Sequence, residues 1–339
     1  MGRTRIEWID IAKGIGIILV IAGHTFSLGY SYPIYAFHMP LFFFLSGLLF
    51  VDKKKNFSDY LKSRTKSLLR PWLFILLISL LVCLAIPEWR NQITLRTVMA
   101  DLYTANTNVF QNSSLWYLVC FYFLLLLVFG INKIKFSEVT KFVFLILFIA
   151  LLWSKEILEL TNLPFHRLPF KIDSAVVALF FFLVAYWYKD VVFKLCTVKI
   201  NILLVALLIV VSGCLCVFNG WSNINSLDFG RIRLLYYPVA LLSIGAICLI
   251  SQMGGAFLTR IKQVLVFYGK NSLLIFGFQS LFIRLYLFFF NKIQGLEMEL
   301  YANNPIYHQI GSFVVVTFII SPLIVLLFTQ LRNKGIRIL

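Results

Sequence analysis

The sequence has few charged residues. Asp, Glu, Lys and Arg make up 13% of its 339 residues, whereas 60% are hydrophobic. A soluble domain needs many more charges to cover its surface, so the composition excludes a soluble fold and indicates an integral membrane protein. No long polar stretch separates the apolar runs, which leaves no room for a separate soluble domain. We predict one membrane domain over residues 1–339, built as an all-α bundle of transmembrane helices.

Cysteine is scarce as well. The six cysteines mostly lie in or beside apolar runs, and none forms a CxxC pair. Cys214 and Cys216 are two residues apart, which places their side chains on different faces of a helix. We interpret the thiols as buried and inert rather than as ligands of a metal or a redox centre. No metal site and no bound cofactor are predicted.

Apolar runs follow one another along the whole chain. Each approaches the roughly 20 residues that a helix needs to span a bilayer. Ten runs can be recognised, at residues 9–29, 33–51, 71–87, 115–131, 142–154, 174–188, 202–218, 234–252, 271–290 and 310–329. The first has no small-residue cleavage site, so we interpret it as a retained helix and not as a signal peptide. About ten spans are therefore expected.

The basic residues fall mainly in alternate loops. The net charge of +17 could suggest a nucleic-acid partner. With the N-terminus in the cytoplasm, however, 21 Lys and Arg residues lie in cytoplasmic segments and eight in outer ones. That distribution follows the positive-inside rule of membrane proteins. We predict that both termini are cytoplasmic, that the protein lies in the inner or plasma membrane, and that it has no nucleic-acid partner.

Lys13, His24 and His38 lie within the first two apolar runs. Lys13 and His24 are eleven residues apart, about three helical turns, so they project from nearly the same face, roughly 16 Å apart along the axis. His38 begins the returning segment and should reach a depth similar to that of His24. Ionisable groups at membrane depth are costly and mark functional sites. A snorkelling Lys13 paired with Asp10 is the plainer alternative for that residue.

The loop after the second run is the most basic segment of the chain. It contains Lys53, Lys54, Lys55, Lys62, Arg64, Lys66 and Arg70. Such a run can reflect topology and contact with anionic lipid alone. It can also bind a phosphate-rich cosubstrate that reaches the membrane from the cytosol, because Arg and Lys clamp phosphate oxygens.

The outer segments 88–114 and 219–233 are rich in Asn, Gln, Ser and Thr, with Trp and Tyr among them. Amide and hydroxyl groups suit hydrogen bonding to a polyol, and aromatic rings suit stacking on a sugar. Ordinary solvated loops with interfacial aromatic residues are the alternative interpretation.

The first fifty residues contain the spacing Lys13-x10-His24, the run Trp8-Ile9-Asp10-Ile11-Ala12-Lys13 and the run Phe37-His38-Met39-Pro40. In these features they resemble the membrane acyltransferase-3 family, in particular its fucose 4-O-acetylase-like branch. Weaker similarities follow at Leu115-Trp116-Tyr117-Leu118, Ile172-Asp173-Ser174 and Tyr268-Gly269-Lys270-Asn271. Together they cover essentially the full length of the chain.

The resemblance implies transfer of an acyl group, most often acetyl, from cytosolic acyl-coenzyme A to a hydroxyl of a carbohydrate. It implies that His24 is the catalytic residue and that Lys13 lies nearer the donor. The chain departs from the family in two places: Arg64-Thr65-Lys66-Ser67 and Arg70 stand where a paired-arginine motif is frequent, and Gln279 stands where relatives can have a histidine. No catalytic role is carried over to Gln279.

Acyl transfer to an alcohol needs a base that takes the hydroxyl proton, and imidazole suits this role near neutral pH. We predict His24 as the general base, with His38 acting beside it by orienting it or by holding the oxyanion. Arg64, Lys66 and Arg70 are the predicted donor-binding residues together with Lys13. Trp116 and Arg284 are predicted at the acceptor, with a structural ion pair as the alternative for Arg284. His166 and His308 are expected at the surface.

Two other functions fit a polytopic chain with polar outer loops. One is a transporter or flippase for a sugar or a polyprenyl-linked glycan, which predicts a polar track through several helices. The other is a non-catalytic member of an envelope-glycan assembly complex. The titratable groups instead concentrate in the first two spans. The favoured prediction is therefore an O-acyltransferase whose partners are acyl-coenzyme A, a carbohydrate acceptor and the lipid bilayer.

Overall fold

The computed structural model describes residues 5–51, 56–197, 202–253, 259–295 and 305–335. The chain is 81% helical with almost no strand, which confirms the all-α prediction. The first half contains α1 (Glu7–Thr25), α2 (Leu28–Tyr35), α3 (His38–Leu49), α4 (Phe57–Arg64), α5 (Arg70–Ala85), α6 (Pro87–Arg90), α7 (Leu95–Thr104), α8 (Trp116–Ile131), α9 (Glu138–Leu147) and α10 (Ser154–Glu159). The second half contains α11 (Ile172–Trp187), α12 (Lys189–Thr197), α13 (Ile202–Asn219), α14 (Tyr236–Ile250), α15 (Thr259–Lys270), α16 (Ser272–Ile293), α17 (Ile306–Val315) and α18 (Ser321–Asn333).

Nine helical segments of the described residues are long and apolar enough to cross a membrane. They are residues 7–25, 29–49, 57–85, 113–131, 164–187, 202–219, 233–250, 272–293 and 306–333. The remaining apolar run, 142–154, lies on α9, a 3-10 segment (Phe148–Trp153) and α10. Its apolar stretch is short and is bounded by Lys141 and Lys155, which distinguishes it from the other nine. The chain is thus a multi-pass membrane protein.

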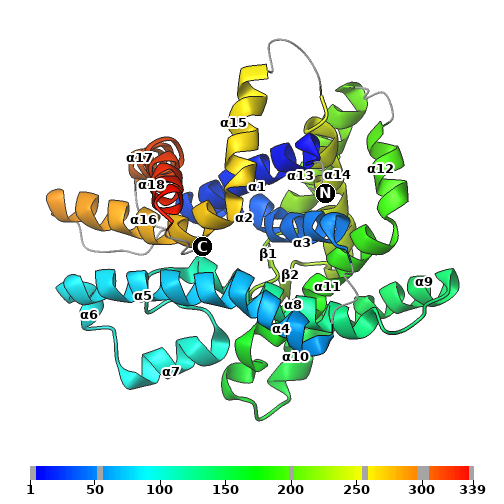
Figure 1. Cartoon of the computed structure of the whole chain (residues 1–339), viewed down its shortest axis with the longest axis horizontal. Coiled ribbons are helices and arrows are strands. Elements are labelled where there is room, and N and C mark those ends of the chain that lie inside the picture. The colour runs from blue at the N-terminus through cyan, green and yellow to red at the C-terminus, as the bar shows by residue number, and fades with distance from the viewer. Residues whose placement is uncertain (1–4, 52–55, 198–201, 254–258, 296–304, 336–339) are drawn as a thin grey trace.

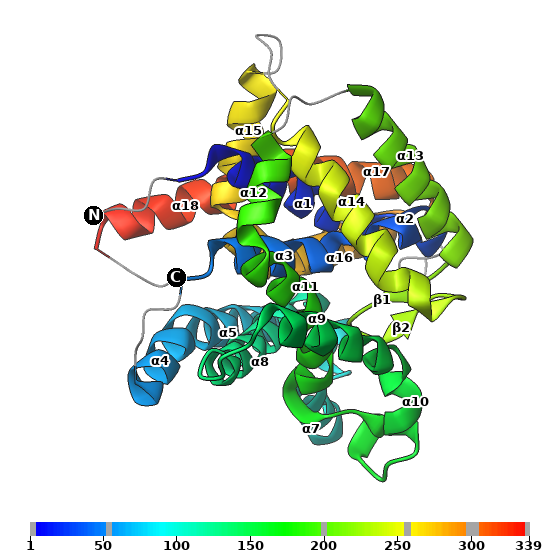
Figure 2. The same cartoon turned by 90° about the vertical axis from the view of Figure 1, so that its right-hand side faces the viewer.

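The beginning of the first described helix and the end of the last one lie on the same side of the bundle. In Figure 2 the beginning of α1 and the end of α18 both lie on the left, and the short strands lie towards the right. We name the two sides after α1: the Lys13 end, where this helix begins, and the His24 end, where it finishes. Six of the 21 basic residues assigned to cytoplasmic segments lie outside the described residues: Arg3, Lys53, Lys54, Lys55, Lys199 and Arg337.

Helix α1 lies inside the bundle and packs on α3, α14, α15, α16 and α17. Its closest neighbour is α15, which crosses it in Figure 1. A Cβ atom added at Gly14 would collide with the backbone carbonyl of Leu265, and one added at Gly269 would collide with that of Asp10. Small residues that let two backbones approach in this way are typical of helix pairs in membranes. The Gly14 and Gly269 contacts therefore fix the position of α1 against α15.

The described strands form one short hairpin. Strand β1 (Ser222–Asn223) pairs antiparallel with β2 (Asp228–Phe229), with Ser222 opposite Phe229 and Asn223 opposite Asp228. The hairpin follows α13, and β1 contacts α2. In Figure 2 the two strands lie below α2, on the side where α1 finishes. The hairpin thus lies against α2, which begins the second span.

Candidate active site

Lys13 and His24 occupy the two ends of α1, as their spacing predicts. Lys13 lies one turn and a half from the beginning of the helix and His24 in its last turn. Both side chains are partly buried. The helix begins after Ile6 and ends at Thr25, where the next residue, Phe26, adopts an extended conformation. Three unbroken turns therefore separate the ammonium group from the imidazole.

Four rings gather at the His24 end. The hydroxyl oxygen of Tyr35 lies 3.4 Å from Nδ1 of His24, and the two rings meet edge to face. The Tyr35 ring also packs against His38, with centroids 4.9 Å apart, and against Trp221, with centroids 4.8 Å apart. Tyr35 is the last residue of α2 and His38 the first of α3. The short turn between these helices brings His38 to Tyr35, and the packing of α2 on α1 brings His24 to the same ring.

The hydrogen bond of His38 fixes which of its nitrogens carries the proton. Nδ1 of His38 lies 2.8 Å from the carbonyl oxygen of Ile34, which can only accept. Nδ1 is therefore the donor, and in the neutral ring Nε2 is an acceptor. The side chain is 2% exposed. A neutral His38 can accept a proton at Nε2, but it cannot donate there to an oxyanion.

Arg284 on α16 approaches the same end of the bundle. It lies within electrostatic range of His24, as does His38. Nη1 of Arg284 donates to Oε1 of Gln111 at 2.6 Å, and Gln111 in turn donates through Nε2 to Gln92 at 3.2 Å. These contacts place Arg284 beside the polar segment 88–114. The guanidinium adds positive charge close to the imidazole of His24.

A cavity lies at the Lys13 end. Its volume is about 320 Å³, within the range of small-ligand pockets. Its walls come from α1, α3, α4, α8 and α11 and include Lys13, Ser46, Tyr60, Ser63 and Arg64. The guanidinium of Arg64 lies over the Tyr60 ring, 4.7 Å from its centroid. Nε of Arg64 is buried without a hydrogen-bond partner. An anionic or polar ligand would satisfy that buried donor.

Helices α1 and α3 connect this cavity to the histidines. Lys13 and Ser46 line the cavity, whereas His24 and His38 lie on the same two helices at the other end. The axial distance is roughly 16 Å along α1 and roughly 12 Å along α3, at 1.5 Å per residue. The arrangement is a cationic cavity on one side of the bundle joined by two helices to a pair of histidines on the other.

A comparison with protein families matches residues 6–329 to a family described as an acyltransferase domain. The chain belongs to the acyltransferase-3 family. No curated protein and no solved structure matches it. The family supports acyl transfer as the reaction of this chain.

Two of the residues predicted to bind the donor do not line the cavity at the Lys13 end. Lys66, in a π-helical turn (Thr65–Leu69), and Arg70, the first residue of α5, are exposed and are not among the residues that line it. Trp116 is buried in the hydrophobic core with 4% exposure, and its ring meets that of Tyr117. Of the predicted donor residues, the structure brings together Lys13 and Arg64.

The prediction for His308 was wrong. His166 is exposed, as expected, but His308 is 2% exposed and packs on the rings of Phe290 and Tyr307. Neither of its ring nitrogens has a hydrogen-bond partner. The sequence places His308 close to the beginning of the last apolar run, and only the packing of α17 on α16 buries it. Gln279 is also buried, with both polar atoms of its side chain unpartnered.

The burial predicted for the cysteines is found at four of the five described positions and is wrong for Cys214. Cys83, Cys120, Cys216 and Cys248 are buried, whereas Cys214 is exposed. Within the described residues, no group of three or more His, Cys, Asp or Glu side chains could hold a metal ion.

Sequence reasoning missed Tyr35 and Trp221. Tyr35 is one of several aromatic residues around the turn, and nothing in the sequence distinguishes it from its neighbours. Trp221 lies in an outer segment that the sequence marks as suited to sugars, but its contact with Tyr35 depends on how the hairpin folds back over α2. The amide-rich composition of residues 219–226 was the one available signal.

Proposed function

We propose that this acyltransferase transfers an acyl group, most often acetyl, from acyl-coenzyme A to a hydroxyl of a cell-envelope or lipid-linked carbohydrate. The observation that supports it is the separation of two sites on α1 and α3, a cationic cavity with Lys13 and Arg64 and a histidine pair with His24 and His38. The donor enters the cavity from the cytosol, and the acceptor meets it at the His24 end. The protein would work in the plasma or inner membrane, with both termini in the cytoplasm.

The cavity suits the charged part of the donor. Lys13 and Arg64 supply two cations, and Nε of Arg64 is a buried donor that still needs an acceptor. Phosphate oxygens fit such a pair because they accept charge-assisted hydrogen bonds. Tyr60 holds the guanidinium from one side and is itself anchored by its hydroxyl, which donates to the carbonyl of Leu125 at 2.9 Å. The acyl end of the donor would then extend between α1 and α3 towards the histidines.

The chemistry at the His24 end is general-base catalysis. When Nδ1 of His24 donates to the oxygen of Tyr35, Nε2 is free to accept the proton of the sugar hydroxyl. The hydroxyl oxygen forms a bond to the thioester carbonyl carbon, the carbon–sulfur bond breaks, and the imidazolium returns the proton to the leaving thiolate. His38, fixed by Ile34, presents Nε2 as a second acceptor. Arg284 places positive charge where the tetrahedral oxyanion develops.

The test is transfer by the purified protein in lipid nanodiscs. Wild type, His24→Ala and His166→Ala would each receive radiolabelled acetyl-coenzyme A and an envelope glycan fraction, with product identified by the mass of one added acetyl group. We expect label in the glycan for wild type and for His166→Ala, whose imidazole is exposed. We expect none above background for His24→Ala. A transporter or an assembly component would leave the glycan unlabelled in all three samples.

A further inference from the structure

The hairpin at the His24 end is held at its base by one side chain. Nδ2 of Asn219 donates to the carbonyl of Phe229 at 3.0 Å, and Oδ1 of Asn219 accepts from the backbone nitrogen of Ile232 at 2.9 Å. The carbonyl of Asn219 also accepts from Arg231 at 2.7 Å. Asn219 is 2% exposed. The two chain ends of the hairpin are therefore joined next to Trp221, the residue before β1.

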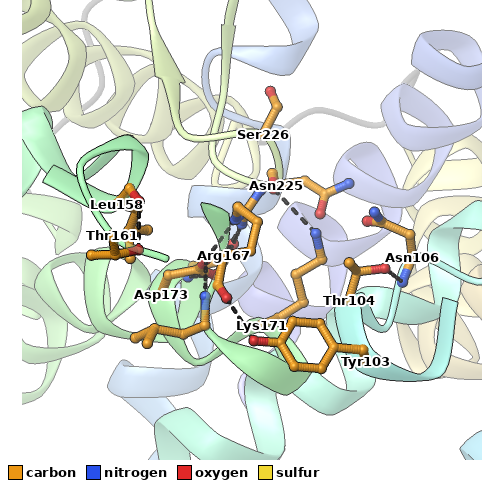
Figure 3. Close-up of polar contacts among 12 residues, drawn as sticks. Tyr103, Thr104, Asn106, Leu158, Thr161, Arg167, Lys171, Asp173, Asn225 and Ser226 are labelled. Carbon is orange, nitrogen blue, oxygen red and sulfur yellow. Dashed lines mark hydrogen bonds and ion pairs between the residues drawn. The ribbon is translucent and has the colours of Figure 1, made fainter. Parts of the chain in front are cut away.

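The tip of the hairpin is held by two cations from the segment just before α11. Nη1 of Arg167 and Nζ of Lys171 both donate to the carbonyl of Asn225, at 2.9 and 3.3 Å. Arg167 is bound in turn by the carboxylate of Asp173, at 2.5 and 2.9 Å. Figure 3 shows the three side chains converging below the hairpin. Lys171 is 2% exposed, so this contact is buried, and the tip cannot move freely.

The indole of Trp221 lies beside the carboxylate of Asp228, a residue of β2. That carboxylate forms an ion pair with Lys155 at 2.6 Å. Burial raises the pKa of the Asp228 carboxyl, but the contacts with Lys155, Ser226 and Trp221 outweigh burial and hold this pKa below its ordinary value of 3.8. The carboxylate next to the indole is thus ionised at neutral pH.

The indole packs on Tyr35 with the two ring planes tilted by 44°, and part of its surface stays open. The Trp221 and Tyr35 centroids are 4.8 Å apart, and Tyr35 reaches His24. Trp221, Tyr35 and His24 are each partly exposed. A tryptophan that only marks the membrane interface faces lipid and needs no such set of supports. Here the base and the tip of the hairpin next to Trp221 are both fixed, which is the support that a ligand-binding side chain needs.

We propose that Trp221 is an acceptor-binding residue, which stacks on the sugar ring whose hydroxyl His24 deprotonates. The inference rests on the proposed function and extends it to the substrate: a pyranose, whose C–H face packs against the electron-rich face of the indole. Lys155, Asp228, Arg167 and Lys171 are positioning residues, because they hold the hairpin next to the indole without reaching His24. The sugar ring then lies beside the Tyr35–His24 pair, with a hydroxyl within reach of the base.

The test measures the KM for the acceptor separately from the KM for the donor. The nanodisc protein would be titrated with the envelope glycan fraction at saturating acetyl-coenzyme A, and then with acetyl-coenzyme A at saturating glycan. We expect Trp221→Leu to raise the acceptor KM by about tenfold, since one aromatic stacking contact is removed. Trp221→Phe keeps an aromatic face and should raise it less. Asp228→Asn, which removes the charge beside the indole, should fall between these two. The donor KM stays at the wild-type value throughout.

Two matched controls distinguish stacking from general disruption. Trp72→Leu makes the same change as Trp221→Leu at a partly buried indole on α5 whose N–H has no partner. Glu88→Gln neutralises a carboxylate, as Asp228→Asn does, but in the exposed ion pair with Lys292. Both controls keep wild-type acceptor KM. An unchanged acceptor KM in Trp221→Leu, or a donor KM that rises by the same factor, overturns the inference. If Trp221→Leu fails to accumulate, the other two variants decide. An unchanged acceptor KM in both Trp221→Phe and Asp228→Asn then overturns the inference.

The failure of this inference can be told from failure of the proposed function. Wild type that labels the glycan, together with a Trp221→Leu variant of unchanged kinetics, refutes the role of Trp221 alone. Wild type that labels no glycan refutes both.

Discussion

The hydroxyl oxygen of Tyr35 lies 3.4 Å from Nδ1 of His24, and the same ring lies between His38 and Trp221. Tyr35 therefore has two separable functions in the proposed mechanism. Its hydroxyl orients the imidazole of His24, and its ring supports the indole. A substitution that removes one and keeps the other can separate them.

Tyr35→Phe should lower kcat by roughly tenfold and leave the acceptor KM unchanged. The variant loses the hydroxyl that orients His24 but keeps the ring that packs on Trp221 and His38, and one orienting hydrogen bond contributes about 0.5–1.5 kcal/mol. Steady-state acetyl transfer to the glycan fraction would measure both constants. An unaltered kcat would show that the 3.4 Å contact does not orient the base.

Charge reversals should separate the cavity from the exposed basic surface. Arg64→Glu should raise the KM for acetyl-coenzyme A by at least about tenfold, because a carboxylate would replace a cation that lines the cavity. Lys66→Glu and Arg70→Glu serve as matched controls on neighbouring turns, where the side chains are exposed and lie outside the cavity lining. Donor titrations of the three variants would decide. Equal increases in all three would place the donor on the whole basic segment.

Gly14→Ala should separate α1 from α15 and destabilise the protein by about 1–3 kcal/mol, the usual effect of overpacking. The added methyl group would meet the carbonyl oxygen of Leu265, which is backbone and cannot turn away. Gly245→Ala on α14 is the control, because a Cβ there meets nothing within 4 Å. Thermal unfolding in one detergent would compare the two. Equal melting temperatures would mean that α1 and α15 are free to shift apart.

Arg167→Ala should destabilise the chain by about 3–5 kcal/mol, because it leaves the buried carboxylate of Asp173 without its cation. Replacing both Arg167 and Asp173 with Ala should cost less than the single change, since no uncompensated charge remains. Thermal unfolding of both variants provides the measurement. A double variant less stable than Arg167→Ala would contradict the ion-pair account.

Local patterns predicted most of the bundle. Nine of the ten apolar runs coincide with helices that could span a membrane, because twenty apolar residues need no tertiary information to be recognised. The placement of Lys13 and His24 followed from helix geometry alone. The run at 142–154 was harder, because Lys141 and Lys155 bound it and its helix changes to 3-10 geometry at Phe148.

Contacts between distant segments could not be predicted. Trp221 reaches Tyr35 across nearly two hundred residues of sequence, and Asn225 is held by Arg167 and Lys171 from another loop. The periodicity of apolar residues along the sequence does not predict contacts between such distant residues. The burial of His308 could not be predicted either. A polar residue close to the beginning of an apolar run is expected at the surface, but here a neighbouring helix covers it.

The most direct test of the mechanism is the kcat of His24→Gln. Glutamine keeps polar bulk and hydrogen-bonding capacity but cannot accept a proton at neutral pH. If His24 is the general base, kcat for acetyl transfer to the glycan fraction should fall by about 10²–10⁴-fold in His24→Gln, while protein yield and the KM for acetyl-coenzyme A match those of His166→Gln. Retention of most of the wild-type kcat by His24→Gln would contradict a general-base role for His24 and would transfer that role to His38.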